Sequence, residues 1–148
     1  MADDPDIEIT RTATGLMLAG ELGWARLDVI GPGVVRIDLE GHGYTDFVPV
    51  LHEPLDASIR DHGQVFIGVD AEGMRSFERR FRYLWTEWIK CERDHIETLL
   101  VLTHNRAVEG AAVIINAVTN TTSVETCRQR DDFEARLDAA VARSRRGS

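Results

Sequence analysis

The sequence is poor in lysine and has no long hydrophobic run. Lys90 is the only lysine, and the 25 acidic residues outnumber the 17 basic ones, which gives a formal net charge of −8. A nucleic-acid backbone would be repelled on average by such a chain, so we exclude sequence-independent nucleic-acid binding. The apolar runs are well short of the roughly 20 residues that cross a bilayer, so no membrane span is expected.

Cysteine and the common cofactor motifs are also scarce. Cys91 and Cys127 lie far apart with no C-x-x-C pattern, and the acidic start, MADDPDIE, lacks the apolar stretch of a signal peptide. We therefore expect two reduced thiols in a cytoplasmic protein. The sequence has no G-x-G-x-x-G loop and no H-E-x-x-H, and its five histidines lack the spacing of a zinc site. Neither a cofactor nor a metal is expected.

What the sequence does contain is a regular succession of strand and helix patterns. Its 148 residues suit one domain, which we place at residues 7–142, between flexible segments at 1–6 and 143–148. Alternating apolar and polar residues predict a β-hairpin over residues 7–20. Two further strands follow, on either side of a turn at Gly31-Pro32-Gly33.

From residue 45 onward, helices alternate with strands. Apolar residues at steps of four predict a helix over residues 45–63, with Asp46 as its N-cap and Gly63 as its end. Pro54 is expected to kink or restart that helix. The remaining expected elements are strands over 64–70, 98–104 and 123–129, and helices over 76–94, 107–120 and 131–144.

Five stretches in this order resemble a known family. They are VVRIDLEGHGYTDF, VFIGVD, FRYLWTEWI, ETLLVLTHNRAVEGAAVIINA and DDFEARLDAAV, and they cover about residues 25–141. Together they resemble the STAS domain of the anti-sigma-factor antagonists, in particular its SpoIIAA-like branch. The resemblance implies an α/β fold: a STAS-like mixed sheet with an N-terminal β-hairpin and helices packed on the sheet.

The resemblance also implies a function. Such domains are small cytoplasmic signalling modules that are not enzymes and that bind a partner protein, and a homodimer is a further expectation. In several members a Ser or Thr at the start of the second helix is phosphorylated to switch binding. Related lipid-carrier folds leave an alternative open, in which the chain carries or senses a small apolar ligand.

Ser76 is the residue nearest to that phosphorylated position, although Arg75 precedes it where the family usually has Asp. Its hydroxyl suits a helix N-cap, and a phosphate there would meet the helix dipole together with Arg75 and Arg79. Asp70 ends a strand, where open α/β sheets often bind ligands, and it also suits an Asx-type turn. We therefore take Ser76, Asp70, Arg75 and Arg79 as the candidate regulatory or partner-binding residues.

Two weaker candidates complete the set. Trp85, in an aromatic helix stripe, and His104, at a strand end, are candidates for a ligand pocket. Asp70, Ser76 and His104 also match a hydrolase triad in composition, but G-x-S-x-G is absent, so a small hydrolase is only a remote alternative.

Overall fold

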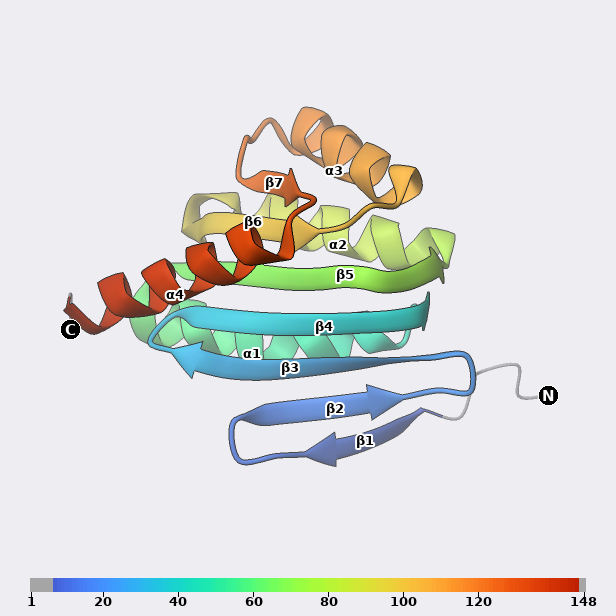
Figure 1. Cartoon of the computed structure of the whole chain (residues 1–148), viewed down its shortest axis with the longest axis horizontal. Helices are drawn as coiled ribbons and strands as arrows, with labels where there is room; N and C mark the ends of the chain where they lie inside the picture. Colours follow the sequence, from blue (N-terminus) through green and yellow to red (C-terminus); the bar gives the residue numbers. More distant parts are fainter. Residues whose placement is uncertain (1–6, 147–148) are drawn as a thin grey trace.

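The structure is a computed structural model that describes residues 7–146. A seven-stranded sheet in the order β1-β2-β3-β4-β5-β6-β7 forms its centre (Figure 1). The strands are β1 (Glu8–Arg11), β2 (Gly15–Ala19), β3 (Gly23–Gly31), β4 (Val34–Gly43), β5 (Val65–Phe77), β6 (Ile96–Leu102) and β7 (Val124–Cys127). The helices are α1 (Phe47–His62), α2 (Arg79–Glu92), α3 (Arg106–Thr119) and α4 (Arg130–Arg146), with a short 3-10 turn η1 (Arg93–His95) after α2.

The sheet is mixed, as the sequence predicts. Strands β1 to β4 pair antiparallel through tight connections, and β4 to β7 pair parallel with helices between them. Parallel neighbours need a crossover, which is why helical patterns begin only after β4. The predicted fold class, an N-terminal β-hairpin followed by alternating helices and strands, is confirmed.

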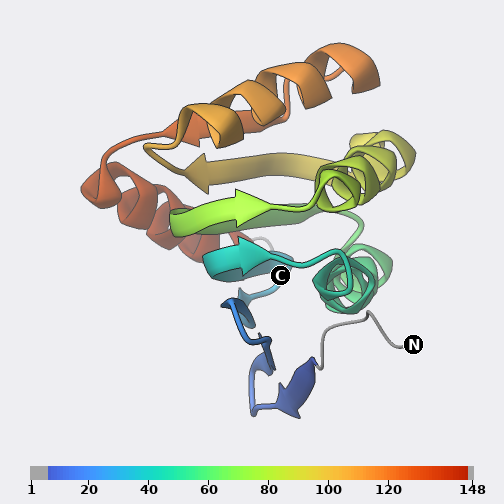
Figure 2. The ribbon, with the colours of Figure 1, turned by 90° about the vertical axis from the view of Figure 1, so that its right-hand side faces the viewer.

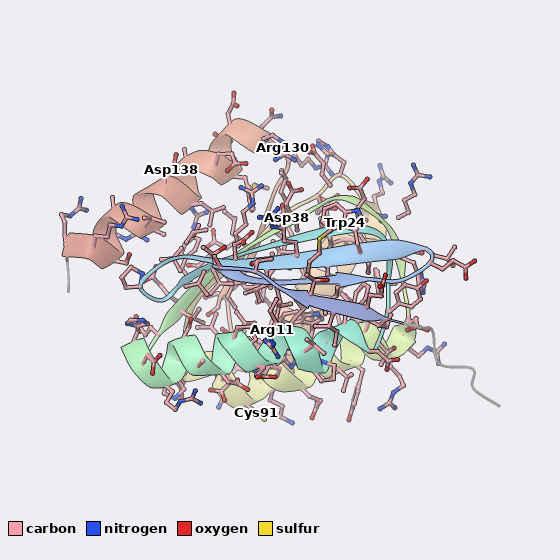
Figure 3. All side chains as sticks on the ribbon, turned by 90° about the horizontal axis from the view of Figure 1, so that it is seen from below. Arg11, Trp24, Asp38, Cys91, Arg130 and Asp138 are labelled. Atoms are coloured by element: carbon pink, nitrogen blue, oxygen red, sulfur yellow. The ribbon has the colours of Figure 1, made fainter. Side chains whose placement is uncertain are left out.

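Helices cover both faces of the sheet. Seen along the strands, α1 and α2 lie on one side and α4 on the other (Figure 2). The larger core joins α1, α2 and α3 to one face, on which Val35, Ile37 and Leu39 of β4 are buried, as their alternation predicts. The smaller core joins α4 to the opposite face, where Phe133 and Leu137 are buried. The view from below separates these two layers (Figure 3).

The first helix matches its prediction in extent but not in every detail. Gly63 ends α1 with φ 82°, and its N–H donates to Ile59 O, as a left-handed C-cap does. Asp46 occupies the N-cap position, but its side chain makes no capping hydrogen bond. The helix continues through Pro54, so the expected restart is wrong. Leu51 and Leu55, on either side of the proline, are both buried against the sheet and hold the helix there.

The largest difference from the sequence prediction lies after Asp70. We expected a loop and then a helix beginning at Ser76; instead β5 continues to Phe77, and α2 begins at Arg79. The extension remains paired with β4, and His42 of β4 faces Ser76. The register between the two strands shifts before this point, where the pairing is irregular. Gly73 packs against Glu40, whose Cγ would lie 3.0 Å from an added Cβ, so a glycine suits this close approach.

The C-terminal helix also extends further than expected. Residues 143–146 belong to α4, and Arg143 Nη2 lies 3.1 Å from Glu97 Oε2. The remainder of the expected flexible segments, residues 1–6 and 147–148, lies outside the described residues. The middle of α4 lies close to β5, because a Cβ at Gly68 would come within 2.5 Å of Leu137 Cδ2.

Candidate functional site

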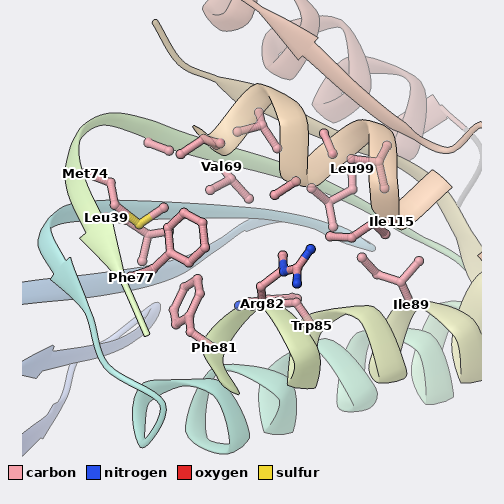
Figure 4. Close-up of a pocket in the computed structure, with 16 residues that line it drawn as sticks. Leu39, Val69, Met74, Phe77, Phe81, Arg82, Trp85, Ile89, Leu99 and Ile115 are labelled. Carbon is pink, nitrogen blue, oxygen red and sulfur yellow. The ribbon is translucent and has the colours of Figure 1, made fainter. Parts of the chain in front are cut away.

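An apolar groove lies between the sheet and helices α2 and α3 (Figure 4). Strands β4 to β7 form its floor, α2 and the end of β5 form one wall, and α3 forms the other. The lining residues are Leu39, Val69, Ala71, Met74, Phe77, Phe81, Arg82, Trp85, Ile89, Leu99, Val101, Val108, Ala111, Ala112, Ile115 and Val124. Arg82 is the only charged residue among them, so we name this feature the apolar groove.

The amphipathic pattern of α2 builds one wall. Phe81, Trp85 and Ile89 recur at steps of four and are at most 8% exposed. The opposite wall is made of smaller side chains, since Ala111 and Ala112 of α3 face the groove. Large aromatic side chains on one helix and alanines on the other leave space between the two.

That space is a cavity of about 90 Å³ that is partly open to solvent. One water molecule needs roughly 10–15 Å³ by this kind of measure, and it also needs polar partners, which this lining does not supply. The cavity therefore suits an apolar group rather than water. At one end the helices are tied together, because Arg93 Nη1 donates to Thr119 O at 3.0 Å.

Arg82 projects from α2 toward α3 across the groove (Figure 4). Its side chain is half-buried, and within residues 7–146 its guanidinium has neither a hydrogen-bond acceptor nor a carboxylate partner. Its backbone O accepts a hydrogen bond from Thr86 Oγ1. The groove thus combines an apolar interior with one unpaired cation.

A second group of side chains lies around the middle of β5, just beyond the end of β6 and at the start of α4. Arg130 Nη2 is 2.8 Å from Asp70 Oδ2 and 2.6 Å from Glu72 Oε1, and His104 Nε2 is 3.0 Å from Glu72 Oε2. The hydrogen bond from Arg130 lowers the pKa of Glu72, and the carboxylates of Glu72 and Asp70 raise the pKa of Arg130. We call Asp70, Glu72, His104 and Arg130 the edge cluster. The ion pairs of Arg130 with Asp70 and Glu72 join the start of α4 to the sheet.

Asp70 forms an Asx-type turn, which is one of the two roles that the sequence predicted for it. Its Oδ1 accepts from Glu72 N at 3.2 Å, which is the expected Asx-type contact. The pairing with Arg130 was not foreseen. Arg36 also reaches this carboxylate, with Nη2 3.4 Å from Asp70 Oδ2.

Ser76 is not a helix N-cap; that expectation is wrong. It is exposed on β5, and its Oγ lies 2.7 Å from Nδ1 of His42, the facing residue of β4. Glu78 occupies the N-cap position of α2 and accepts from Thr45 N. This hydrogen bond lowers the pKa of Glu78, and the nearby His42 lowers it further.

The hydrolase triad considered from the sequence does not form. Ser76 pairs with His42, His104 pairs with Glu72, and Asp70 pairs with arginines, so the three residues have separate partners. The Ser76–His42 pair lies on the surface, and neither residue lines the apolar groove.

The remaining predicted residues lie in different parts of the structure. Arg75 and Arg79 are exposed on either side of the β5–α2 junction. Trp85 does line the apolar groove, whereas His104 belongs to the edge cluster and does not. Arg82 was not among the site residues predicted from the sequence. Its signal was its spacing, since it lies three residues before Trp85 and seven before Ile89.

Within the described residues, no group of His, Cys, Asp and Glu side chains is arranged to hold a metal ion. In the same part of the chain, no helix combines the length and the apolar character that crossing a membrane requires.

Comparison with known proteins places the fold in a class. The chain has a SpoIIAA-like α/β fold, which confirms the resemblance found in the sequence. A solved structure that matches is that of an uncharacterised protein from the DUF3478 family with a SpoIIAA-like fold, from Shewanella loihica PV-4. It aligns over 93% of this chain and 98% of its own, with a TM-score of 0.56 and 9% sequence identity. At this identity the likeness concerns the fold alone. No family model and no curated protein matches the sequence.

Proposed function

We propose that this protein acts by binding rather than by catalysis, and that the apolar groove takes up the hydrocarbon part of a small ligand. The observation that carries this proposal is the groove itself, a hollow whose only charged lining residue is Arg82. Apolar clefts with few polar groups are where small-molecule ligands bind in proteins. The protein is then a carrier or sensor of an apolar ligand.

The size of the cavity defines how a ligand would enter. A volume of about 90 Å³ holds only part of a hydrocarbon chain. Further insertion requires α2 and α3 to separate at the end away from the Arg93–Thr119 hydrogen bond. Ala111 and Ala112 favour such a movement, because small side chains leave α3 less tightly interlocked with α2.

Binding of a protein partner is the second candidate, and the outer face of α3 supports it. Val113, Ile114 and Val118 are 69%, 46% and 60% exposed. Adjacent exposed apolar side chains are a common mark of an interaction surface. A second copy of this chain is the partner that can be tested directly. Ile114→Glu would then turn a dimer into a monomer in sedimentation experiments, and an unchanged sedimentation coefficient would argue against this surface.

Regulation at Ser76 belongs to this second candidate. Ser76 is exposed and lies between the exposed Arg75 and the start of α2, so a kinase could reach its hydroxyl. A phosphate would replace the contact with His42 by two negative charges next to Arg75. A test compares partner binding by wild type, Ser76→Ala and Ser76→Asp. Equal binding by all three would show that Ser76 is not a switch.

The indole N–H signals of the tryptophans test the ligand proposal. Trp85 lines the groove, whereas Trp24 faces a polar hollow beside Arg130 on the other side of the sheet. Titration of ¹⁵N-labelled protein with 1-decanol should shift the Trp85 signal and leave that of Trp24 in place. Assignment uses the Trp24→Phe and Trp85→Phe variants.

A matched pair of substitutions on α3 locates the binding. Ala111→Leu fills the groove and should abolish the shift, while Ala117→Leu on the exposed side of the same helix should preserve it. If 1-decanol shifts neither tryptophan, or if both variants bind it as wild type does, the groove is not the binding site.

A further inference from the structure

We infer that the ligand of the apolar groove is an anionic amphiphile, a fatty carboxylate, and that Arg82 holds its head group. This inference rests on the proposed function, since it specifies the class of ligand for the same groove.

Only two of these arginines are not exposed, and they are Arg36 and Arg82. Arg36 is surrounded by carboxylates: its Nη1 is 2.7 Å from Glu134 Oε1, its Nε is 3.2 Å from Asp38 Oδ1, and its Nη2 reaches Asp70. Arg82 has no carboxylate partner within residues 7–146. Residues 7–146 thus supply counterions for one half-buried guanidinium and none for the other.

A half-buried cation without a partner is unfavourable, because it has lost part of its hydration and gained nothing in return. At Arg82 the surroundings make this stronger. Phe81 and Trp85 flank it on α2, and Ile115 lies across the groove on α3 (Figure 4). An anion that arrives with its own apolar chain would satisfy the guanidinium and fill the cavity at the same time.

Geometry favours a carboxylate head. Guanidinium and carboxylate groups form two parallel N–H···O hydrogen bonds, and charge-assisted bonds of this kind are about twice as strong as neutral ones. A carboxylate carries a single charge, which matches the one cation present in the lining. The hydrocarbon chain would then extend from Arg82 over the floor formed by Val69 and Val101.

The test compares two ligands that differ only in the head group, decanoate and 1-decanol, at pH 8 by isothermal titration calorimetry. We expect wild type to bind decanoate more tightly. Arg82→Gln should weaken decanoate binding about tenfold, since a hydrogen bond to a charged group contributes that much or more, and should change 1-decanol binding less than about twofold. Arg82→Lys, which keeps the charge but cannot form the two parallel hydrogen bonds of a guanidinium, should recover only part of the decanoate affinity.

Arg80→Gln is the matched control, because Arg80 is exposed on the same helix and does not line the groove. It removes the same charge from the protein and should leave both affinities unchanged. Thermal unfolding verifies that every variant is folded.

The outcomes separate the two claims. If 1-decanol binds and Arg82→Gln weakens both ligands equally or neither, the groove binds apolar chains but Arg82 does not select the head group, and the inference is overturned. If Arg80→Gln weakens decanoate as much as Arg82→Gln does, the effect is one of general charge, and the inference is again overturned. If neither ligand binds wild type, the inference and the proposed function both fail.

Discussion

The imidazole of His52 stacks on the indole of Trp88, with 5.0 Å between the ring centroids and 21° between the planes. Trp85 meets the same imidazole edge-on at 4.5 Å. His52 therefore joins α1 to the helix that forms one wall of the apolar groove. Its Nε2 is buried and has no hydrogen-bond partner in the described part of the chain.

This packing makes stability depend on pH. Burial lowers the pKa of His52 to about 4, although nearby Asp56 opposes the shift. The unfolded chain, with a pKa near 6.5, binds more protons than the folded protein between these values. The free energy of unfolding should therefore fall as the pH is lowered from about 6.5 to about 4, by on the order of 3 kcal/mol from His52 alone.

Urea denaturation at pH 7, 5.5 and 4 measures this contribution when wild type is compared with His52→Phe. Glu72 and Glu78 also have lowered pKa values, so only the difference between the two proteins reports on His52. His62→Phe, at an exposed position of the same helix, is the control and should follow wild type. Parallel pH profiles for wild type and His52→Phe would contradict this account.

Arg36 and Arg130, on the α4 side of the sheet, should contribute unequally to the free energy of unfolding. The side chain of Arg36 is 22% exposed and lies over the ring of Phe133 at 5.4 Å, whereas that of Arg130 is 45% exposed. Arg36→Ala leaves Asp38 without its partner in a setting where burial raises its pKa, and should cost about 2–3 kcal/mol. Arg130→Ala should cost less than about 1 kcal/mol, since exposed ion pairs are screened by water.

Chemical denaturation of the two variants checks this order. Raising the salt concentration should further reduce the loss of stability caused by Arg130→Ala and leave most of the loss caused by Arg36→Ala. Equal losses for the two variants would show that burial does not govern the strength of this network.

A glycine in β5 sets the distance between α4 and the sheet. Because a Cβ at Gly68 would lie 2.5 Å from Leu137 Cδ2, Gly68→Ala should displace this buried leucine and cost about 1–3 kcal/mol. Gly110→Ala is the matched control. Nothing lies within 4 Å of its added Cβ, so this change in a helix should stabilise the protein by about 0.5–1 kcal/mol. Thermal unfolding should move in opposite directions for the two variants.

Replacing Ser76 distinguishes the helix N-cap predicted from the sequence from the strand position that the structure shows. Loss of an N-cap hydroxyl costs about 1 kcal/mol, whereas an exposed strand residue paired with a surface histidine contributes little. Ser76→Ala should therefore change the free energy of unfolding by less than about 0.5 kcal/mol. A loss near 1 kcal/mol or more would indicate that α2 begins at Ser76 in solution.

The order of elements was predictable because periodicity is a local property. The alternation of Val35, Ile37 and Leu39, and the left-handed end of α1 at Gly63, follow from the residues themselves. The end of β5 was not predictable in this way. Gly73 and Ser76 suit a turn and a cap, but pairing with β4 extends the strand beyond both, and pairing is a property of two distant segments.

The site was predictable only in part, for a similar reason. Trp85 was predictable because it belongs to the aromatic stripe of α2. Arg82 lies beside that stripe, and its half-buried state arises only because α3 crosses nearby. The edge cluster likewise depends on Arg130, which reaches Asp70 from 60 residues further along the chain.

The most direct test of the central claim is to locate a bound hydrocarbon chain by nuclear Overhauser effects between decanoate and the methyl groups of the protein. We expect contacts from the decanoate methylenes to Val101, Val108 and Ile115 in the groove, and none to Val113 and Val118 on the outer face of α3. Contacts confined to Val113 and Val118, or no contacts at all in saturated samples, would contradict it.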